Sequence, residues 1–197
     1  MMTLLQAIIL GLVQGLTEFL PISSTAHLVL AQNLLGFTEP PIALDIIMHL
    51  ATALATVIVL WPVIKAINFK HLKFILLAMV PTGILGLWLN QWDKLIFGSI
   101  MFSAVTLLLN GLILLLPQFI KVKLKTLNNQ TAVLIGVAQG IAVLPGISRS
   151  GSTIVSGLLL GLKPATDYNF YLIISLPAIL AAQIYNFNDL NMVATEM

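Results

Sequence analysis

Long uncharged runs of apolar residues limit the folds open to this chain more than any other feature of its sequence. A helix needs about 20 apolar residues to cross the hydrocarbon core of a bilayer. Four runs of roughly that length contain no Asp, Glu, Lys or Arg: residues 46–64, 74–92, 97–117 and 168–188. Charged residues make up only 8% of the chain, whereas they make up about 25% of a typical soluble domain. We therefore expect an all-α integral membrane protein that crosses the lipid bilayer several times, with no nucleic acid among its partners.

Two further apolar regions, residues 3–36 and 131–162, are each interrupted near the middle by proline, glycine and hydroxyl residues. The interruptions resemble each other, because VQGLTEFLPISS at 13–24 and AQGIAVLPGISR at 138–149 align at an offset of 125 residues. Chance similarity between two glycine-rich apolar segments is one explanation. An internal duplication is the other, and paired broken segments in two halves of a membrane protein mark a site where the halves meet.

The placement of the lysines indicates how these regions cross the membrane. Seven of the nine basic residues occupy three places in the chain: Lys65, Lys70 and Lys73; Lys121, Lys123 and Lys125; and Lys163. If both broken regions are hairpins that enter and leave on one side, all three places fall on one face, which the positive-inside rule makes cytoplasmic. Loops 65–73 and 118–129 are then expected on the cytoplasmic face, and loop 90–96 on the outer face.

Hairpins at both breaks predict an inverted-repeat helical bundle with two re-entrant helical hairpins. Residues 1–125 form the first repeat, with the re-entrant hairpin 3–36 and three transmembrane helices. Residues 126–197 form a second, incomplete repeat, with the re-entrant hairpin 131–162 and one transmembrane helix. Because an odd number of crossings separates the hairpins, they enter from opposite faces and their tips can meet near the middle of the bilayer.

Polar residues concentrate at the two breaks. The first break carries Gln14 and Glu18, which share a helix face, followed by Ser23, Ser24, Thr25 and His27. The second break carries Ser148, Ser150, Thr153 and Arg149, the only arginine in the sequence. Helix starts present free N–H groups to anions, and the fork of an arginine suits phosphate oxygens. The two breaks together predict an anion-binding site.

Plainer roles are also open to these residues. Hydroxyl groups in membrane helices usually bond to a neighbouring helix. Glu18 and Arg149 could form a structural ion pair between the hairpins. His49, in the run 46–64, is expected to be a satisfied polar contact rather than a base.

The motifs QGLTEFLPISSTAH, residues 14–27, and PGISRSGST, residues 145–153, closely resemble those of the undecaprenyl-pyrophosphate phosphatase family of the bacitracin-resistance type. The resemblance extends over the chain to about residue 186. It implies a hydrolase of the bacterial plasma membrane that removes the terminal phosphate from undecaprenyl diphosphate, with its active site toward the periplasm or outer face. It also implies recycling of the lipid carrier for peptidoglycan synthesis, bacitracin resistance, and a divalent cation, Mg²⁺ or Ca²⁺, as cofactor.

Carried over residue by residue, the resemblance implies catalytic roles for Glu18, Ser24, His27 and Arg149. The substrate-binding residues that it implies are Gln14, Ser23, Thr25, Ser148, Ser150 and Thr153. Glu18 and Gln14 are expected to hold the cation. Many members have glutamate where this chain has Gln14, which removes one carboxylate from the expected metal site.

The sequence leaves several alternatives open. Ser24 is either the nucleophile or a phosphate ligand beside a water that His27 activates. The chain ends two helices earlier than most family members, so we expect it to need a partner, most simply a second copy in a homodimer, or to be unstable and poorly active alone. An inactive truncated paralogue is a further alternative. Inverted repeats with broken helices also build transporters, so a flippase of polyprenyl phosphate lipid is the rival function.

Overall fold

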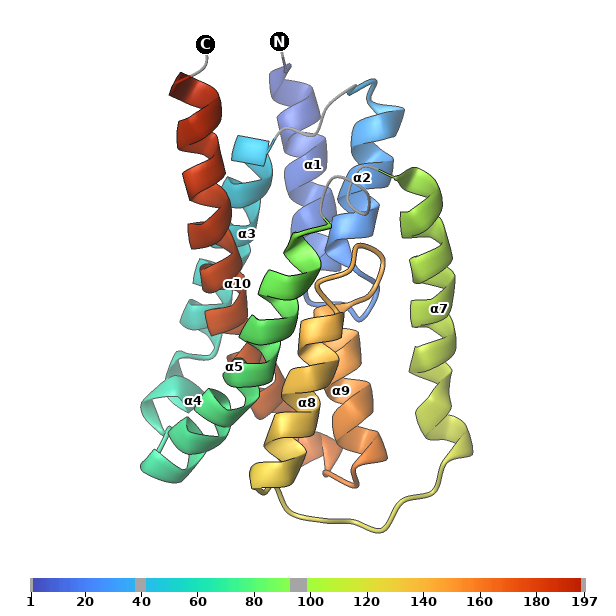
Figure 1. Ribbon diagram of the computed structural model, residues 1–197, viewed down its shortest axis with the longest axis vertical. Coiled ribbons are helices and arrows are strands. Elements are labelled where there is room, and N and C mark those ends of the chain that lie inside the picture. Colours follow the sequence, from blue (N-terminus) through green and yellow to red (C-terminus); the bar gives the residue numbers. More distant parts are fainter. Residues whose placement is uncertain (1, 38–41, 93–98, 196–197) are drawn as a thin grey trace.

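The fold is helical in the residues that the computed structural model describes, which are 2–37, 42–92 and 99–195. No strand occurs within these ranges, which confirms the predicted all-α class. The helices are α1 (Leu4–Thr17), α2 (Ser24–Leu34), α3 (Ile42–Val59), α4 (Trp61–Lys65), α5 (Phe69–Asn90), α7 (Ile100–Phe119), α8 (Asn129–Ile141), α9 (Arg149–Leu159) and α10 (Pro164–Thr195). They pack side by side as an elongated bundle (Figure 1).

Polar side chains fix where two of the central helices begin. Thr3 and Gln6 form reciprocal hydrogen bonds at the start of α1, and Asn128 and Thr131 do the same at the start of α8. The first N–H groups of a helix have no partner within it, so such capping boxes set the residue at which the helix starts. Both capped helices are the first arms of the broken regions.

Two helical hairpins enter the bundle from its opposite ends (Figure 1). The outer ends of α1 and α2 lie at the end of the bundle where α1 begins, and those of α8 and α9 lie at the other end. The breaks between the arms, residues 18–23 and 142–148, both lie near mid-height. The two breaks therefore approach each other inside the bundle.

Helices α5 and α7 are each long and apolar enough to cross a membrane. Their mean hydropathies are 1.9 over Phe69–Leu89 and 2.2 over Ile100–Phe119. These two stretches correspond to the predicted runs 74–92 and 97–117, although residues 93–98, and with them most of the predicted outer loop 90–96, lie outside the described part of the chain.

The apolar run 46–64 does not form one helix. α3 ends at Val59 and α4 begins at Trp61, with Pro62 in the first turn of α4. Proline lacks the N–H that an interior helical position needs, but it fits a first turn, where that N–H would have no partner. The expectation of one continuous span over this run is therefore wrong at its C-terminal end.

Close packing of small residues holds the second hairpin against α5. A Cβ added at Gly136 of α8 would collide with the carbonyl oxygen of Ala78 on α5, and one added at Gly140 would lie 2.8 Å from the Cβ of Leu85. Small residues let membrane helices approach closely. Glycines at these two positions therefore let α8, the first arm of the second hairpin, lie directly against α5.

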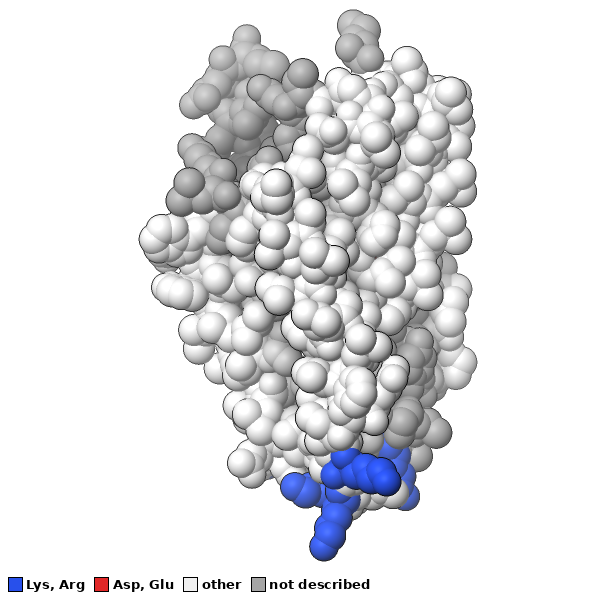
Figure 2. All heavy atoms as spheres, turned by 90° about the vertical axis from the view of Figure 1, so that its right-hand side faces the viewer, with Lys and Arg blue, Asp and Glu red and all other residues white. Residues whose placement is uncertain are grey.

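The charges lie at one end of the face that Figure 2 shows. Lysines gather there, and the described residues visible above them are neither acidic nor basic. This end holds the linker between α7 and α8, which carries Lys121, Lys123 and Lys125. Apolar flanks with basic residues at one end are the pattern of a bundle embedded in a membrane.

Candidate active site

The break in the first hairpin places a strained serine at the start of a helix. Ser23, the residue before α2, has φ 63° and ψ 92°, a region that residues other than glycine rarely adopt. Such strain gathers at functional sites, where the surrounding structure imposes it. The Ser23 side chain makes no capping bond, so the first N–H groups of α2 lack a side-chain cap. An uncapped helix start of this kind can bind an anion.

Glu18 and Ser24 face each other across this break. The Ser24 hydroxyl donates a hydrogen bond to Oε2 of Glu18 at 2.5 Å, and Nε2 of Gln14 donates to the same oxygen at 2.9 Å. The expected shared face of Gln14 and Glu18 is therefore confirmed. The Glu18 side chain is only 10% exposed. A largely buried carboxylate that accepts a hydrogen bond from a serine hydroxyl is the arrangement of a base and its nucleophile.

A contact with the backbone determines which ring nitrogen of His27 faces a hydrogen-bond acceptor. Nδ1 of His27 lies 2.8 Å from the carbonyl oxygen of Ser23. A carbonyl oxygen only accepts, so this bond puts the proton on Nδ1 and leaves Nε2 as the basic nitrogen. His27 and Ser24 are three residues apart on α2 and share one face of it. His27 can therefore act as a base on the same side as Ser24.

A second histidine lies beside Glu18, although the sequence indicated no role for it in the site. Nε2 of His49 on α3 is 3.9 Å from Oε2 of Glu18, and its Nδ1 is 2.8 Å from the carbonyl oxygen of Asp45. Thr52, one turn further along α3, accepts a hydrogen bond from Nε2 of Gln14 at 3.4 Å. The His-x-x-Thr spacing on an apolar helix is the pattern that could have indicated this second wall of the site.

Direct hydrogen bonds join the two breaks. The N–H of Gly146 donates to the Ser23 hydroxyl at 3.2 Å, and the Ser150 hydroxyl donates to the carbonyl oxygen of Leu20 at 3.2 Å. Gly146 has φ 96°, and a Cβ there would collide with Thr106, so this position requires glycine. The structure thus brings Ser23 and Ser150, predicted site residues from opposite halves of the chain, into the same region.

The remaining predicted hydroxyls differ in how they are engaged. Ser148 caps α9 by accepting the N–H of Gly151 at 3.1 Å. Thr153 donates to the carbonyl oxygen of Ser150 within α9 at 3.1 Å. Thr25 is half-buried in the first turn of α2. Ser148 and Thr153 are thus already held by protein groups, whereas the position of Thr25 is that of a residue beside an open helix start.

Arg149 is the first residue of α9 and is half-buried. Among the described residues, the basic side-chain nitrogen within 4.0 Å of the Glu18 carboxylate is Nε2 of His49, and no nitrogen of Arg149 lies that close. Arg149 lies close enough to act electrostatically on Glu18 without pairing with it. The structural ion pair that the sequence left open is therefore not formed. A guanidinium at membrane depth needs an anion. Arg149 begins the helix whose Ser150 bonds to the first break, so an anion bound at this join could supply the partner.

Helix α7 contacts both breaks through polar side chains that sequence reasoning missed. Thr106 donates a hydrogen bond to the carbonyl oxygen of Pro145. The Asn110 amide donates to the carbonyl oxygen of Pro21 at 3.0 Å and accepts from the N–H of Ser148 at 3.0 Å. Thr106 and Asn110 are four residues apart, so they form one polar stripe on an apolar helix, and that spacing could have indicated a contact with the site.

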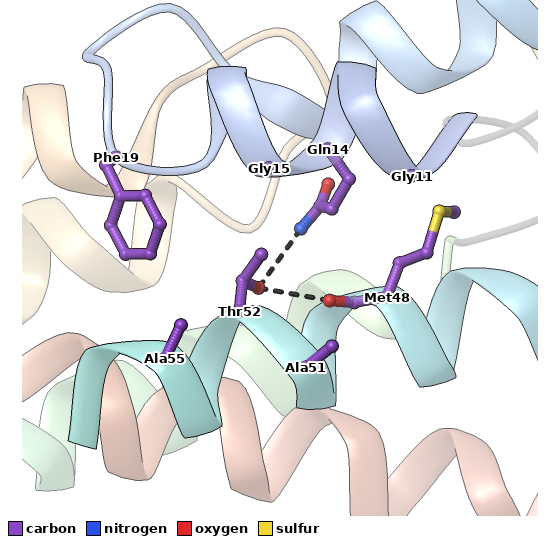
Figure 3. A pocket seen from close by; sticks show the side chains of 8 residues that line it. All are labelled: Gly11, Gln14, Gly15, Phe19, Met48, Ala51, Thr52 and Ala55. Atoms are coloured by element: carbon purple, nitrogen blue, oxygen red, sulfur yellow. Dashed lines mark hydrogen bonds between the residues drawn. The ribbon is translucent and has the colours of Figure 1, made fainter. Parts of the chain in front are cut away.

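An open groove of about 340 Å³ lies between α1 and α3 and reaches the site from the side (Figure 3). Its lining residues are mostly small or apolar: Gly11, Gln14, Gly15, Phe19, Met48, Ala51, Thr52 and Ala55. Gln14 and Thr52 are the polar members and are buried. Nothing lies within 4 Å of a Cβ added at Gly11 or Gly15. An apolar chain can therefore lie in this groove and reach the side chain that bonds Glu18.

The donor atoms around Glu18 fit a hard divalent cation. Oε1 of Gln14 is buried and has no hydrogen-bond partner among the described residues, while Nε2 of the same side chain bonds Glu18. The described residues contain no group of three or more His, Cys, Asp or Glu side chains placed to hold a metal. Mg²⁺ and Ca²⁺ prefer oxygen ligands, and Mg²⁺ in particular is often held by one or two protein groups together with water and phosphate.

Fold and site together define an integral membrane protein in which a serine and a carboxylate are paired where two helical hairpins meet. The sequence matches the family described as bacitracin resistance protein BacA over residues 7–197. The chain belongs to this family.

Curated relatives that carry the name undecaprenyl-diphosphatase are similar over nearly the whole chain. The protein from Sulfurihydrogenibium sp. (strain YO3AOP1) is 43% identical over 94% of this chain and 76% of its own length. That from Bacteroides thetaiotaomicron is 41% identical over 91% of this chain and 73% of its own length. That from Halothermothrix orenii is 39% identical over 95% of this chain and 76% of its own length.

Proposed function

We propose that this chain is an undecaprenyl diphosphatase, which hydrolyses undecaprenyl diphosphate to undecaprenyl phosphate and inorganic phosphate. The observation that carries the proposal is the 2.5 Å hydrogen bond from Ser24 to Glu18 beside the uncapped start of α2. The names of the relatives support the same substrate and reaction. The reaction would recycle the lipid carrier of peptidoglycan synthesis and confer bacitracin resistance. Release of inorganic phosphate from undecaprenyl diphosphate by the purified chain tests it.

In the proposed reaction, the Ser24 oxygen attacks the terminal phosphorus of the diphosphate. Glu18 accepts the hydroxyl proton, the bond from that phosphorus to the bridging oxygen breaks, and undecaprenyl phosphate leaves. Water then attacks the phosphorus of the phosphoserine, with Nε2 of His27 accepting a proton from the water. The bond from phosphorus to the Ser24 oxygen breaks, inorganic phosphate leaves, and Glu18 returns its proton to Ser24. In the alternative route, His27 activates a water that attacks directly, and Ser24 only binds phosphate.

Two positive features would hold the diphosphate during this reaction. The free N–H groups at the start of α2 lie next to Ser24 and favour negative charge. Arg149, at the start of α9, can bind two phosphate oxygens through its fork. Placed on opposite sides of the join between the hairpins, these groups would bind the phosphoryl group that is transferred and the phosphate that leaves.

A divalent cation, Mg²⁺ or Ca²⁺, completes the proposal. Glu18 and the unpartnered Oε1 of Gln14 would hold it. When bound, the cation would neutralise negative charge on the phosphates.

Gln14→Glu tests this cation role. The substitution removes the Nε2 donor that lies 2.9 Å from Oε2 of Glu18 and sets a second carboxylate in its place. Two close carboxylates repel each other unless a cation lies between them. We expect the variant to stay active and its half-maximal Mg²⁺ or Ca²⁺ concentration to fall roughly threefold or more, measured by phosphate release in cation titrations from an EDTA-treated sample.

Gln6→Glu is the matched control, because it makes the same change two turns earlier on α1, near the start of the helix. Its cation requirement should equal that of the wild type. An unchanged cation requirement in Gln14→Glu would remove Gln14 from the proposed cation site.

In the membrane, the two hairpins would be re-entrant and the two halves, 1–125 and 126–197, would form an inverted repeat. The entry of the hairpins from opposite ends and the mid-height position of both breaks support this arrangement (Figure 1). The basic α7–α8 linker would then face the cytoplasm, and α1 and α2 would open toward the periplasm or outer face of the plasma membrane. The active site would be reached from that outer side.

Single-cysteine labelling tests this orientation, since the chain has no cysteine of its own. Leu34, at the end of α2, is 86% exposed, and Lys123 lies in the α7–α8 linker. An impermeant maleimide added to intact cells should label Leu34→Cys at once and Lys123→Cys only after permeabilisation. Labelling of Lys123→Cys in intact cells would reverse the proposed orientation.

The groove between α1 and α3 supports a lipid substrate. It is an open groove, its lining is mostly small or apolar, and Gln14 projects into it from α1 (Figure 3). The apolar isoprenoid chain next to the diphosphate would lie in it and be shielded from water. The substrate would thus approach from the bilayer, with its head group directed toward Glu18 and Ser24.

A further inference from the structure

Asn110 is a buried polar side chain in the middle of a strongly apolar helix. The mean hydropathy of α7 is 2.2, and the polar side chain of Asn110 is only 3% exposed. A side-chain amide at membrane depth needs hydrogen-bond partners from the protein, because lipid tails offer none. The hydrogen-bond partners of Asn110 therefore show which segments of the chain this side chain holds in place.

Both ends of the Asn110 amide are engaged, one at each break. Nδ2 donates to the carbonyl oxygen of Pro21 at 3.0 Å, and Oδ1 accepts from the N–H of Ser148 at 3.0 Å. A carbonyl can only accept and a backbone N–H can only donate, so the amide fits these two partners in one orientation alone. One side chain therefore joins backbone segments that are 127 residues apart in the sequence.

The two segments that Asn110 joins carry the groups of the proposed reaction. Pro21 lies three residues before Ser24, and Ser148 immediately precedes Arg149. The bonds from Gly146 to Ser23 and from Ser150 to Leu20 run directly between the breaks. The Asn110 bonds differ because they tie both breaks to a third element, α7.

We propose that Asn110 is a positioning residue that sets the separation between Ser24 and Arg149. The inference rests on the proposed function, because that function makes Ser24 the nucleophile and Arg149 the residue that binds the diphosphate. Asn110 acts through the backbone at Pro21 and Ser148 and does not touch the substrate. A displacement of about 1 Å between reacting groups can cost on the order of 100-fold in rate, so losing this bridge should act on turnover.

Asn110→Leu tests the proposal, since leucine has the same number of side-chain heavy atoms as asparagine, with the same branching, and bonds to neither break. We expect kcat to fall about 10- to 100-fold and KM to change by less than roughly threefold, because Arg149 and the start of α2 are still present. Thr82→Val is the matched control, because it removes buried bonds between α5 and α8 away from both breaks. The Thr82 hydroxyl donates to the carbonyl oxygen of Gly136 at 2.9 Å and accepts from Nε2 of Gln139 at 3.2 Å. The kcat of Thr82→Val should stay near the wild-type value, even where its loss of thermal stability is similar to that of Asn110→Leu.

Asn110→Asp separates the two contacts. It keeps an acceptor for the Ser148 N–H and loses the donor to Pro21, so its kcat should lie between those of the wild type and Asn110→Leu. Wild-type kcat in Asn110→Leu, or a loss no larger than that of Thr82→Val at equal stability, would overturn the positioning role.

A distance measurement keeps this test separate from that of the proposed function. Nitroxide labels at Leu20→Cys and Ile147→Cys report the separation of the two breaks by electron spin resonance, whether or not the chain turns over substrate. We expect Asn110→Leu to broaden or shift the distance distribution and Thr82→Val to leave it unchanged. An unchanged distribution in Asn110→Leu overturns the inference, whereas absence of phosphate release by the wild type overturns the proposed function.

Discussion

Replacing Ser24 with alanine should lower kcat for phosphate release on the order of 1,000-fold or more, because loss of a nucleophile leaves only the contribution of binding groups. The substitution removes the oxygen that donates to Glu18 at 2.5 Å, while Gln14 still donates to the same carboxylate at 2.9 Å. The carboxylate therefore keeps a partner, and we expect the variant to fold. Steady-state phosphate release with saturating undecaprenyl diphosphate measures the effect.

Ser156→Ala is the matched control for this experiment. Ser156 lies on α9 of the second hairpin, where its hydroxyl donates to the carbonyl oxygen of Thr153 at 3.1 Å. It is more than a turn along α9 from the second break. Its kcat should stay within roughly twofold of the wild-type value. If Ser24→Ala keeps a tenth or more of wild-type turnover, direct attack by a water that His27 activates becomes the better mechanism.

Arg149→Lys should fail almost as completely as removal of the side chain, although it preserves the charge. A lysine is a point charge and cannot hold two phosphate oxygens as a planar fork. We expect kcat/KM to fall on the order of 100-fold. Binding of a non-hydrolysable methylene diphosphonate analogue of the substrate should weaken in parallel, since the lost contact is with the diphosphate.

Lys123→Arg makes the reverse exchange in the exposed α7–α8 linker and should change neither value. Normal binding of the analogue by Arg149→Lys would contradict the assignment and favour a structural role for Arg149. Because the described residues show no Arg149 nitrogen within 4.0 Å of the Glu18 carboxylate, we do not expect that outcome.

The sequence predicted the features that appear as regular patterns along the chain, namely apolar runs, matching segments and helical spacing. The uncharged runs indicated membrane helices, and the offset between the Gln14 and Gln139 segments indicated two matching breaks. The four-residue spacing of Gln14 and Glu18 predicted their shared face, because neighbours on one helix follow directly from the helical period. Contacts between neighbours on one helix can therefore be predicted from the sequence without knowing how the helices pack.

Contacts between helices could not be predicted in the same way. The spacing of His49 and Thr52 on α3, and of Thr106 and Asn110 on α7, marks a polar face on each helix. The sequence does not state which other segment that face contacts, so the partners of His49 and Asn110 emerge only when the helices are packed. Proline shows the same limit: Pro81 lies inside α5, whereas Pro62 lies in the first turn of a new helix. Neighbouring helices, which the sequence does not specify, can compensate for one proline and not for another.

The most direct measurement of the central claim is a product analysis of the purified chain acting on undecaprenyl diphosphate in detergent, with and without EDTA. We expect one inorganic phosphate and one undecaprenyl phosphate for each substrate consumed, with EDTA suppressing both. Transport of polyprenyl phosphate between leaflets of a vesicle, with no phosphate released in detergent, would contradict the account and identify a flippase instead.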